Sequence, residues 1–176
     1  DINRYPTDIG AIPYSADLNG RQYTSNNIQL SSIPRRMYIY ARPSNSALYA
    51  SPNLTDTYYG ISAINIQFNN RSGLLSGASQ YQLYQMSVKN HCDMSWTQWS
   101  GYPVYVTSYD PATVNKKYGT IGSVLCIEFG TDIGLADYEA PGMNGQFQLL
   151  VTPTIYNCDP TGAHDAIPVT LYLVIV

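Results

Sequence analysis

Residues 61–68, ISAINIQF, decide the class of fold. From Ile64 onward apolar and polar side chains alternate. In an extended strand this period of two places Ile64, Ile66 and Phe68 on one face and their polar neighbours on the other. A strand with one apolar face and one polar face is typical of an antiparallel sheet that covers a core on one side.

Five further stretches are rich in β-branched and aromatic residues and are bounded by glycine, proline or polar turn residues, which predicts strands. They are residues 36–42, 103–107, 122–129, 146–156 and 169–176. Pro153 predicts a bulge or an edge position in its strand, because proline has no backbone N–H to donate. The last stretch is so apolar that we expect it to pair inside a sheet or against a partner.

One segment favours a helix. Residues 78–86 contain neither glycine nor proline, and Leu83 and Met86 recur at helical spacing. Ser76 or Ser79 is the expected N-cap and Asn90 the expected stop. The connections, for example residues 43–46, 109–112 and 157–162, contain the residue types that form turns.

These elements predict an all-β, antiparallel, eight-stranded jelly-roll sandwich with one short inserted helix. We expect residues 28–176 to form a single jelly-roll domain and residues 1–27 to be an N-terminal arm or a first strand. The chain has 176 residues, which is one domain's worth of sequence. It begins with Asp1 and shows no apolar signal segment, which is typical of a processed product or of a piece of a longer protein.

Composition argues against several functions. The net charge is −3 and the pI about 5.1, so a specific nucleic-acid partner is not expected. No apolar run is long enough for a transmembrane helix. The three cysteines have no zinc-site spacing, and Cys126 is expected to be a small buried side chain.

Catalytic chemistry has few candidate residues. The chain has two histidines, His91 and His164, and two glutamates, Glu128 and Glu139. Metal sites need three or four spaced ligands, so we interpret His91-Cys92-Asp93 as a polar loop. We therefore predict no enzyme, no cofactor and no metal.

The unusual feature is aromatic. Charged residues are 12% of the chain, about half the usual share, and tyrosine occurs 17 times. Tyrosine is enriched and lysine and glutamate are depleted in protein interfaces. The predicted interface comprises the helix-to-turn block 81–102 and loops near other tyrosines, with these candidates: Tyr58, Tyr59, Tyr81, Tyr84, Trp96, Trp99, Tyr102 and Tyr109. The alternative is a carbohydrate-binding jelly-roll module in which Trp96, Trp99 or a loop tyrosine stacks on a sugar ring.

The order of several segments resembles the second jelly roll of double jelly-roll major capsid proteins. That family occurs in virophages, Polinton-type elements, and adenovirus-like or large eukaryotic DNA viruses. The resemblance covers residues 28–176, and the segments that carry it are residues 32–43, 68–76, 82–90, 95–101, 122–125, 132–135, 145–148 and Asn157.

The resemblance implies a structural protein of the icosahedral virion shell that is assembled inside the infected host cell. In this family two jelly rolls form one subunit, and three subunits form a pseudo-hexagonal capsomer. The implied partners are further copies of the chain in a homotrimer, neighbouring capsomers and the upstream jelly-roll half of the same subunit. Minor capsid proteins are a further class of partner that the resemblance implies. This chain has length for one jelly roll, so it corresponds to one half of such a subunit or to a single-jelly-roll relative such as a vertex or minor capsid protein.

Overall fold

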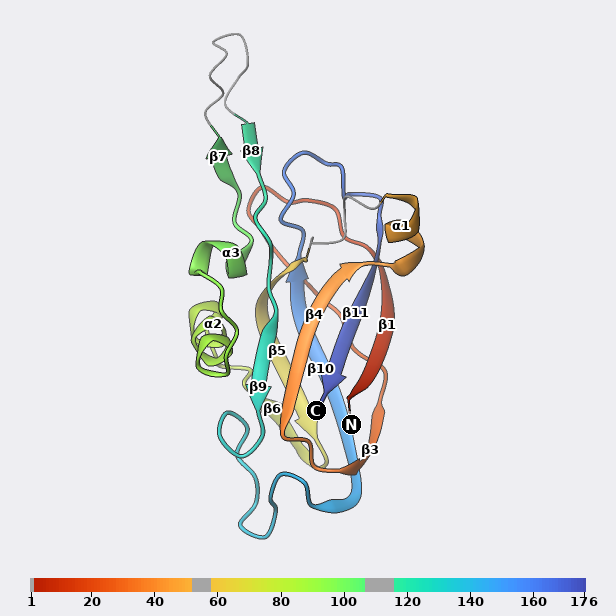
Figure 1. The fold of residues 1–176 in the computed structure, drawn as a ribbon, viewed down its shortest axis with the longest axis vertical. Coiled ribbons are helices and arrows are strands. Elements are labelled where there is room, and N and C mark those ends of the chain that lie inside the picture. The colour runs from red at the N-terminus through yellow and green to blue at the C-terminus, as the bar shows by residue number, and fades with distance from the viewer. Residues whose placement is uncertain (1, 52–57, 107–115) are drawn as a thin grey trace.

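Two antiparallel sheets face each other in the computed structural model, which describes residues 2–51, 58–106 and 116–176 (Figure 1). The first sheet has the order β1-β11-β4-β9, with bounds Asn3–Ala11, Pro168–Ile175, Arg36–Pro43 and Leu125–Glu128. The second has the order β3-β10-β5-β6, with bounds Ile28–Ser32, Asn144–Tyr156, Gly60–Phe68 and Arg71–Leu74. The short strand β2 (Arg21–Gln22) also pairs with β10.

This strand order is that of a jelly roll. When the two-residue strand β2 is left out, the other eight strands of the two sheets, counted along the chain, run 1-8-3-6 in the first and 2-7-4-5 in the second. Apart from the consecutive strands β5 and β6, neighbours in each sheet come from distant parts of the sequence, as they do where Greek keys are wound together. The predicted antiparallel jelly roll is confirmed, and the segment left open as an arm or a first strand contains β1.

The core fills the space between the sheets. Inward side chains alternate with outward ones along each long strand, and Ile64, Ile66 and Phe68 are all buried as their spacing predicts. β11 lies between β1 and β4, and its Val169, Leu171, Leu173 and Ile175 enter the core.

Pro153 lies inside β10, not on a sheet edge. Its carbonyl accepts a hydrogen bond from the Tyr23 backbone N–H, at a place where the chain passes between β2 and β3. The register between β10 and β5 shifts at the next residues, Thr154 and Ile155. The sequence left two alternatives for Pro153, a bulge or an edge position. The structure shows an irregularity in the strand pairing beside the proline, and Pro153 is not at an edge.

The described residues contain three helices, so the prediction of a single helix is wrong. The expected one is α2 (Gln80–Lys89), which starts at a Ser79 capping box and ends at Asn90. The others are α1 (Asn45–Ala50) and α3 (Trp96–Ser100). Ser95 and Gln98 form a capping box at α3, a Ser-x-x-Gln signal that is present in the sequence.

Two more strands, β7 (Val104–Val106) and β8 (Lys116–Tyr118), form a separate ribbon. The ribbon extends away from the sandwich beyond α3, at the top of Figure 1. Gly101 ends α3 with a φ of 71°, and a Cβ at this position would lie 2.3 Å from Cys158 Sγ. Glycine is therefore required at the point where the chain leaves the helix.

Candidate functional site: the contact surfaces

Five of the predicted interface residues come together beside the first sheet. Tyr81 and Tyr84 are on α2, Trp96 and Trp99 are on α3, and Tyr102 follows α3. Their neighbouring ring centroids are 5.2–6.2 Å apart. We call these five residues the aromatic cluster.

Trp99 is the buried centre of the cluster. Its side chain is 0% exposed, and its indole Nε1 donates a hydrogen bond of 3.0 Å to the Val124 carbonyl. Trp99 therefore attaches α3 to the core and does not lie on the surface, which corrects its place among the interface candidates.

The outer members of the cluster remain accessible. Tyr81 is 50% exposed and Tyr102 is 38% exposed, whereas Trp96 and Tyr84 are half-buried. The Tyr102 hydroxyl donates to Gln80 Oε1, and Gln80 Nε2 in turn donates to the Tyr156 hydroxyl, so these groups are held in place.

The geometry of the cluster does not suit a sugar. Tyr81 lies at 68° and Tyr102 at 84° to the ring of Trp96, so the accessible rings share no flat face. Trp99 is nearly parallel to Trp96 but is buried. The aromatic cluster therefore offers a sugar no shared flat platform.

The loop tyrosines have three different positions. Tyr59 is 1% exposed and belongs to the core, where burial raises the pKa of its hydroxyl, so it too is removed from the surface candidates. Tyr58 is half-buried, and its ring meets that of Tyr40 edge-on at 5.7 Å. Tyr109 lies outside the described residues.

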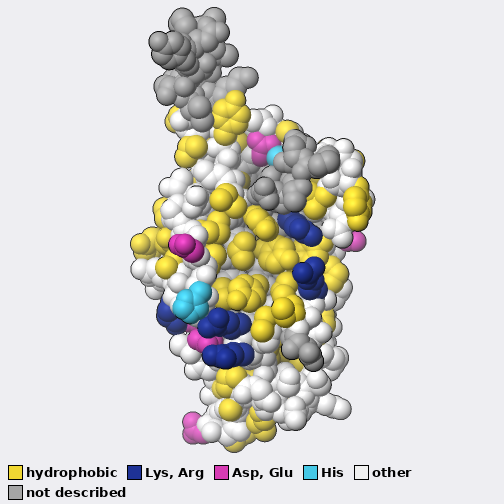
Figure 2. All heavy atoms as spheres, viewed as in Figure 1, with side chains coloured by type: hydrophobic (Ala, Val, Ile, Leu, Met, Phe, Trp, Pro, Cys, Tyr) yellow, Lys and Arg dark blue, Asp and Glu magenta, His cyan; other side chains and the backbone are white. Residues whose placement is uncertain are grey.

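The outer face of the first sheet carries tyrosines and arginines that were not among the candidates from the sequence. Tyr40 of β4 stacks on Tyr172 of β11 at 5.3 Å, and the Arg42 guanidinium lies 5.0 Å from the centre of the Tyr172 ring. Figure 2 shows this face as an apolar centre with basic side chains on both sides. We call Arg4, Tyr38, Tyr40, Arg42 and Tyr172 the tyrosine–arginine face.

A basic pair borders this face. Arg35 and Arg36 both approach Glu128 of β9, with Nε–Oε1 distances of 4.0 and 3.7 Å. The Arg35 side chain is 74% exposed, so it keeps most of its donors free for another acceptor. The register of the strands, which places Arg36 opposite Glu128, is what brings these charges together.

A buried carboxylate joins α2 to the end of β9. Asp132 accepts hydrogen bonds from Lys89 Nζ at 2.8 Å, Asn90 Nδ2 at 2.7 Å and the Glu128 backbone N–H at 3.0 Å. Burial works to raise the pKa of Asp132, but these three bonds outweigh it and hold the pKa below its ordinary value. The network fixes the helix that carries Tyr81 and Tyr84, two of the five residues of the aromatic cluster.

Replacing Asp132 with asparagine is expected to destabilise the domain by about 1–3 kcal/mol at pH 7, because an amide cannot accept all three bonds as strongly as a carboxylate. The pKa of Asp132 is lower in the folded state, so its stabilisation is present above a pH of about 4 and is lost as the pH falls through the folded pKa. Urea unfolding of both proteins from pH 7 to pH 3 measures this. A difference between the two that does not shrink in acid would contradict the assignment.

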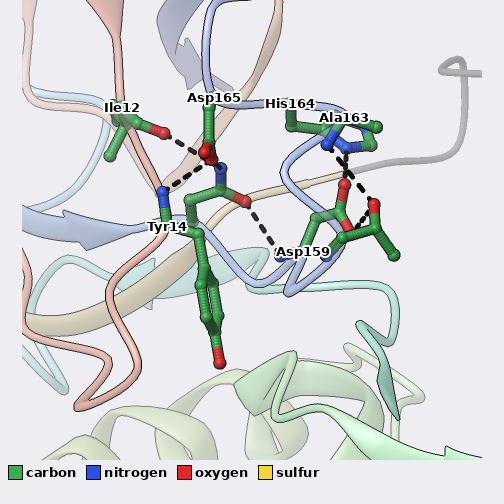
Figure 3. Close-up of polar contacts among 8 residues, drawn as sticks. Ile12, Tyr14, Asp159, Ala163, His164 and Asp165 are labelled. Carbon is green, nitrogen blue, oxygen red and sulfur yellow. Dashed lines mark hydrogen bonds and ion pairs between the residues drawn. The ribbon is translucent and has the colours of Figure 1, made fainter. Parts of the chain in front are cut away.

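The loop between β10 and β11 is an ordered polar network (Figure 3). Asn157 Nδ2 donates to the Ile12 carbonyl at 2.9 Å, and Asp165 Oδ1 accepts from the Tyr14 backbone N–H at 2.8 Å. Asp159 accepts two bonds from Thr161 and lies 2.5 Å from His164 Nδ1. From the sequence, residues 157–162 were expected only to form turns.

In the residues that the structure describes, the hydroxyl beside the His164–Asp159 pair, that of Thr161, bonds to Asp159 and not to His164. A general base needs its free nitrogen within hydrogen-bond reach of a hydroxyl or thiol. His164 Nε2 is buried, and no hydrogen-bond partner for it occurs in the residues that the structure describes. The hydrogen bonds of Asp159 with Thr161 and its contact with His164 hold these two side chains in their own loop.

The other predicted absences concern metals and membranes. Within residues 2–51, 58–106 and 116–176, no three His, Cys, Asp or Glu side chains are grouped as a metal site would need. His91 and Asp93 are exposed, and Cys126 is buried as expected. None of the described helices is long and apolar enough to cross a membrane.

Known proteins are similar to this chain in sequence and in architecture. The family model for the major capsid protein V20 C-terminal domain matches residues 5–176. The putative capsid protein V20 of Sputnik virophage is 34% identical over 158 residues, which are 88% of this chain and 26% of that protein.

Solved structures agree. A chain in the cryo-EM structure of the Sputnik virophage superposes with a TM-score of 0.84 at 30% identity, over 99% of this chain and 34% of that one. The major capsid protein of mavirus has the same fold, with a TM-score of 0.74 at 18% identity over 99% of this chain and 38% of that protein. The chain thus spans about a quarter to two fifths of the length of these relatives. From the family match across residues 5–176, this chain belongs to the family of the major capsid protein V20 C-terminal domain.

Proposed function

We propose that this chain is the C-terminal jelly roll of a major capsid protein and that its role is structural. It packs against the rest of its own subunit and against copies of itself to build the shell of a virion inside the infected cell. The observation that carries this proposal is the family match over residues 5–176. Its surfaces support it, because they carry aromatic rings and arginines that are available for contacts.

The tyrosine–arginine face supports a contact with a neighbouring jelly roll. Stacked tyrosines bury large rigid areas at low cost in conformational entropy, and arginine binds carboxylates through a fixed fork of donors. Both residue types are enriched at binding hot spots. We infer that the remaining part of the subunit covers this face, and that three such subunits form a capsomer to which minor capsid proteins bind.

The β7–β8 ribbon supports contacts outside the subunit. Tyr105 is 69% exposed and Tyr118 is 44% exposed. An isolated two-stranded ribbon is only marginally stable in water, so a neighbour that buries these rings would stabilise it. The ribbon continues from the accessible part of the aromatic cluster through Tyr102, and together they form one contact surface.

The test is the oligomeric mass by light scattering, together with electron microscopy, of this chain alone and of the longer subunit that contains it. We expect trimers or shell-like particles when the rest of the subunit is present. Strict monomers in both forms, at high concentration, would overturn the structural role.

Surface variants identify the contact in the same experiment. Tyr40→Ala with Arg42→Ala is expected to reduce trimer formation, because the double variant loses the ring that stacks on Tyr172 and the guanidinium that lies over Tyr172. Tyr49→Ala on α1 is the matched control, since Tyr49 is 86% exposed and is not among the five residues of this face. Equal trimer yield from both variants would remove the tyrosine–arginine face from the proposal.

A further inference from the structure

The outer face of the second sheet carries no ionisable side chain along its three longest strands. In β3, β5 and β10 the buried side chains alternate with outward ones. The outward residues are small, apolar or uncharged polar: Gln29, Ser31, Ala63, Asn65, Gln67, Gln146, Gln148, Leu150, Thr152 and Thr154. We call these ten positions the amide face.

The absence of charge on this face contrasts with the outer face of the first sheet. Roughly a quarter to a third of a soluble protein surface is normally charged. The first sheet carries outward arginines, including Arg36 and Arg42, and an outward Glu128. The sequence therefore places its few charges on other surfaces and leaves one broad sheet face neutral.

The register groups the amides into rows. Gln148 pairs with Gln29 on one side of β10, and Leu150 and Thr152 pair with Gln67 and Asn65 on the other. Within the part of the chain that the structure describes, the side chains of Gln29, Asn65 and Gln67 form no hydrogen bond with another protein group. Their donors and acceptors are free for another molecule.

A shallow hollow includes Gln67, Gln148 and Leu150 of this face. It has a volume of about 100 Å³ and is lined by Asn27, Gln67, Asn69, Gln148 and Leu150. It has room for about three waters at ~30 Å³ each, or for the amide group of one inserted side chain. Leu150 contributes an apolar contact among four amide side chains.

We propose that the amide face binds the amide face of a second copy of this chain around a two-fold axis. The proposal rests on the proposed capsid role and specifies one of its copy-to-copy contacts. An amide side chain donates and accepts at once, so a surface of amides is complementary to itself. Two chains of net charge −3 repel each other least where neither carries a charge. A contact between identical surfaces closes as a dimer by symmetry.

The contact is weak by itself. Three strands spaced ~4.8 Å apart, with a rise of ~3.3 Å per residue over about ten residues, give an area of roughly 450 Å² for each copy. Stable dimers bury about 800 Å² for each partner. A dissociation constant near the millimolar range is therefore expected, which suffices when a shell repeats the contact many times. Because no charge lies within the contact, salt does not weaken it, and screening of the repulsion between two chains of net charge −3 favours it.

Side-chain amides can be observed directly in solution. In a dilution series of the ¹⁵N-labelled chain up to about 1 mM, we expect concentration-dependent shifts of the NH₂ signals of Gln29, Asn65, Gln67 and Gln148. The shifts should be no smaller at 500 mM than at 50 mM NaCl, because salt screens only the repulsion between the two chains. Shifts confined to other surfaces, or no shifts at all, would overturn the proposal.

Charged variants test whether the two faces are identical. Asn65→Asp with Gln67→Glu should weaken self-association more than about tenfold, because like charges then face each other across the axis. Asn65→Lys with Gln67→Lys should do the same, and a mixture of the acidic and basic proteins should associate again. Asn19→Asp with Gln85→Glu is the matched control, since both residues are exposed and lie outside the amide face.

The outcomes separate this inference from the proposed function. A mixture that stays monomeric, or face variants that associate as the control does, would overturn the amide-face contact. Particle formation by the longer subunit is measured independently, so a shell that forms normally with the acidic variant would overturn the contact and leave the capsid role standing. Retained thermal melting of each variant shows that the fold is intact.

Discussion

A chain that lacks residues 169–176 is expected to give no cooperative thermal unfolding transition. These residues make up nearly all of β11, which pairs with β1 on one side and with β4 on the other. Their loss leaves two strands with unpaired backbone groups facing a disrupted core, and it removes four buried apolar side chains. Circular dichroism during heating measures the result.

If the truncated chain cannot be purified, a single substitution in β11 tests the same prediction. Leu171 is 0% exposed, and Leu171→Ala is expected to cost about 2–5 kcal/mol of the free energy of unfolding. Val174→Ala is the control, because this neighbouring side chain is on the outer face of the same strand and is only half-buried. A truncated chain that melts cooperatively, or equal costs for Leu171 and Val174, would contradict the central position of β11.

Trp99→Ala is expected to cost about 3–5 kcal/mol, because it removes a large buried ring and leaves a cavity beneath α3. The Val124 carbonyl also loses the hydrogen bond from the indole Nε1. Urea unfolding of the purified chain measures the change.

Trp96→Ala is the matched control on the same helix. Trp96 is half-buried, so its removal should cost clearly less stability. In assembly we expect the reverse order. Trp96→Ala should reduce the yield of assembled particles directly, because part of the Trp96 ring is exposed, whereas Trp99→Ala should act on assembly only by destabilising the fold. Equal stability of both variants would show that Trp99 is not a core residue.

The fold was largely predictable from the sequence, because the strands and the helix ends have local signals. The alternation through Ile64, Ile66 and Phe68 fixes which side chains of β5 face inward. Ser79 and Asn90 bound α2 as their capping chemistry predicts. α3 was missed although Ser95 and Gln98 carry the same capping signal, since five residues are too few to show helical periodicity.

The contact surfaces were predictable only in part. An excess of tyrosine indicates interfaces, but it does not say which rings lie on the surface. Trp96 and Trp99 are three residues apart on one helix, and only the position of α3 against Val124 determines that Trp99 is buried. The tyrosine–arginine face was not predicted, because Tyr40 and Tyr172 are brought together by strand pairing across more than a hundred residues.

The sequence by itself determined the alternation of each strand, the caps of α2 and the small supply of catalytic groups. These are local properties, fixed by backbone geometry and residue type. The tertiary structure alone decided which aromatic rings form the core and which remain accessible, and it assigned arginines to one sheet face and neutral amides to the other. Those outcomes depend on the order in which distant strands pair and on which layer covers which, and neither is encoded in any single stretch of the chain.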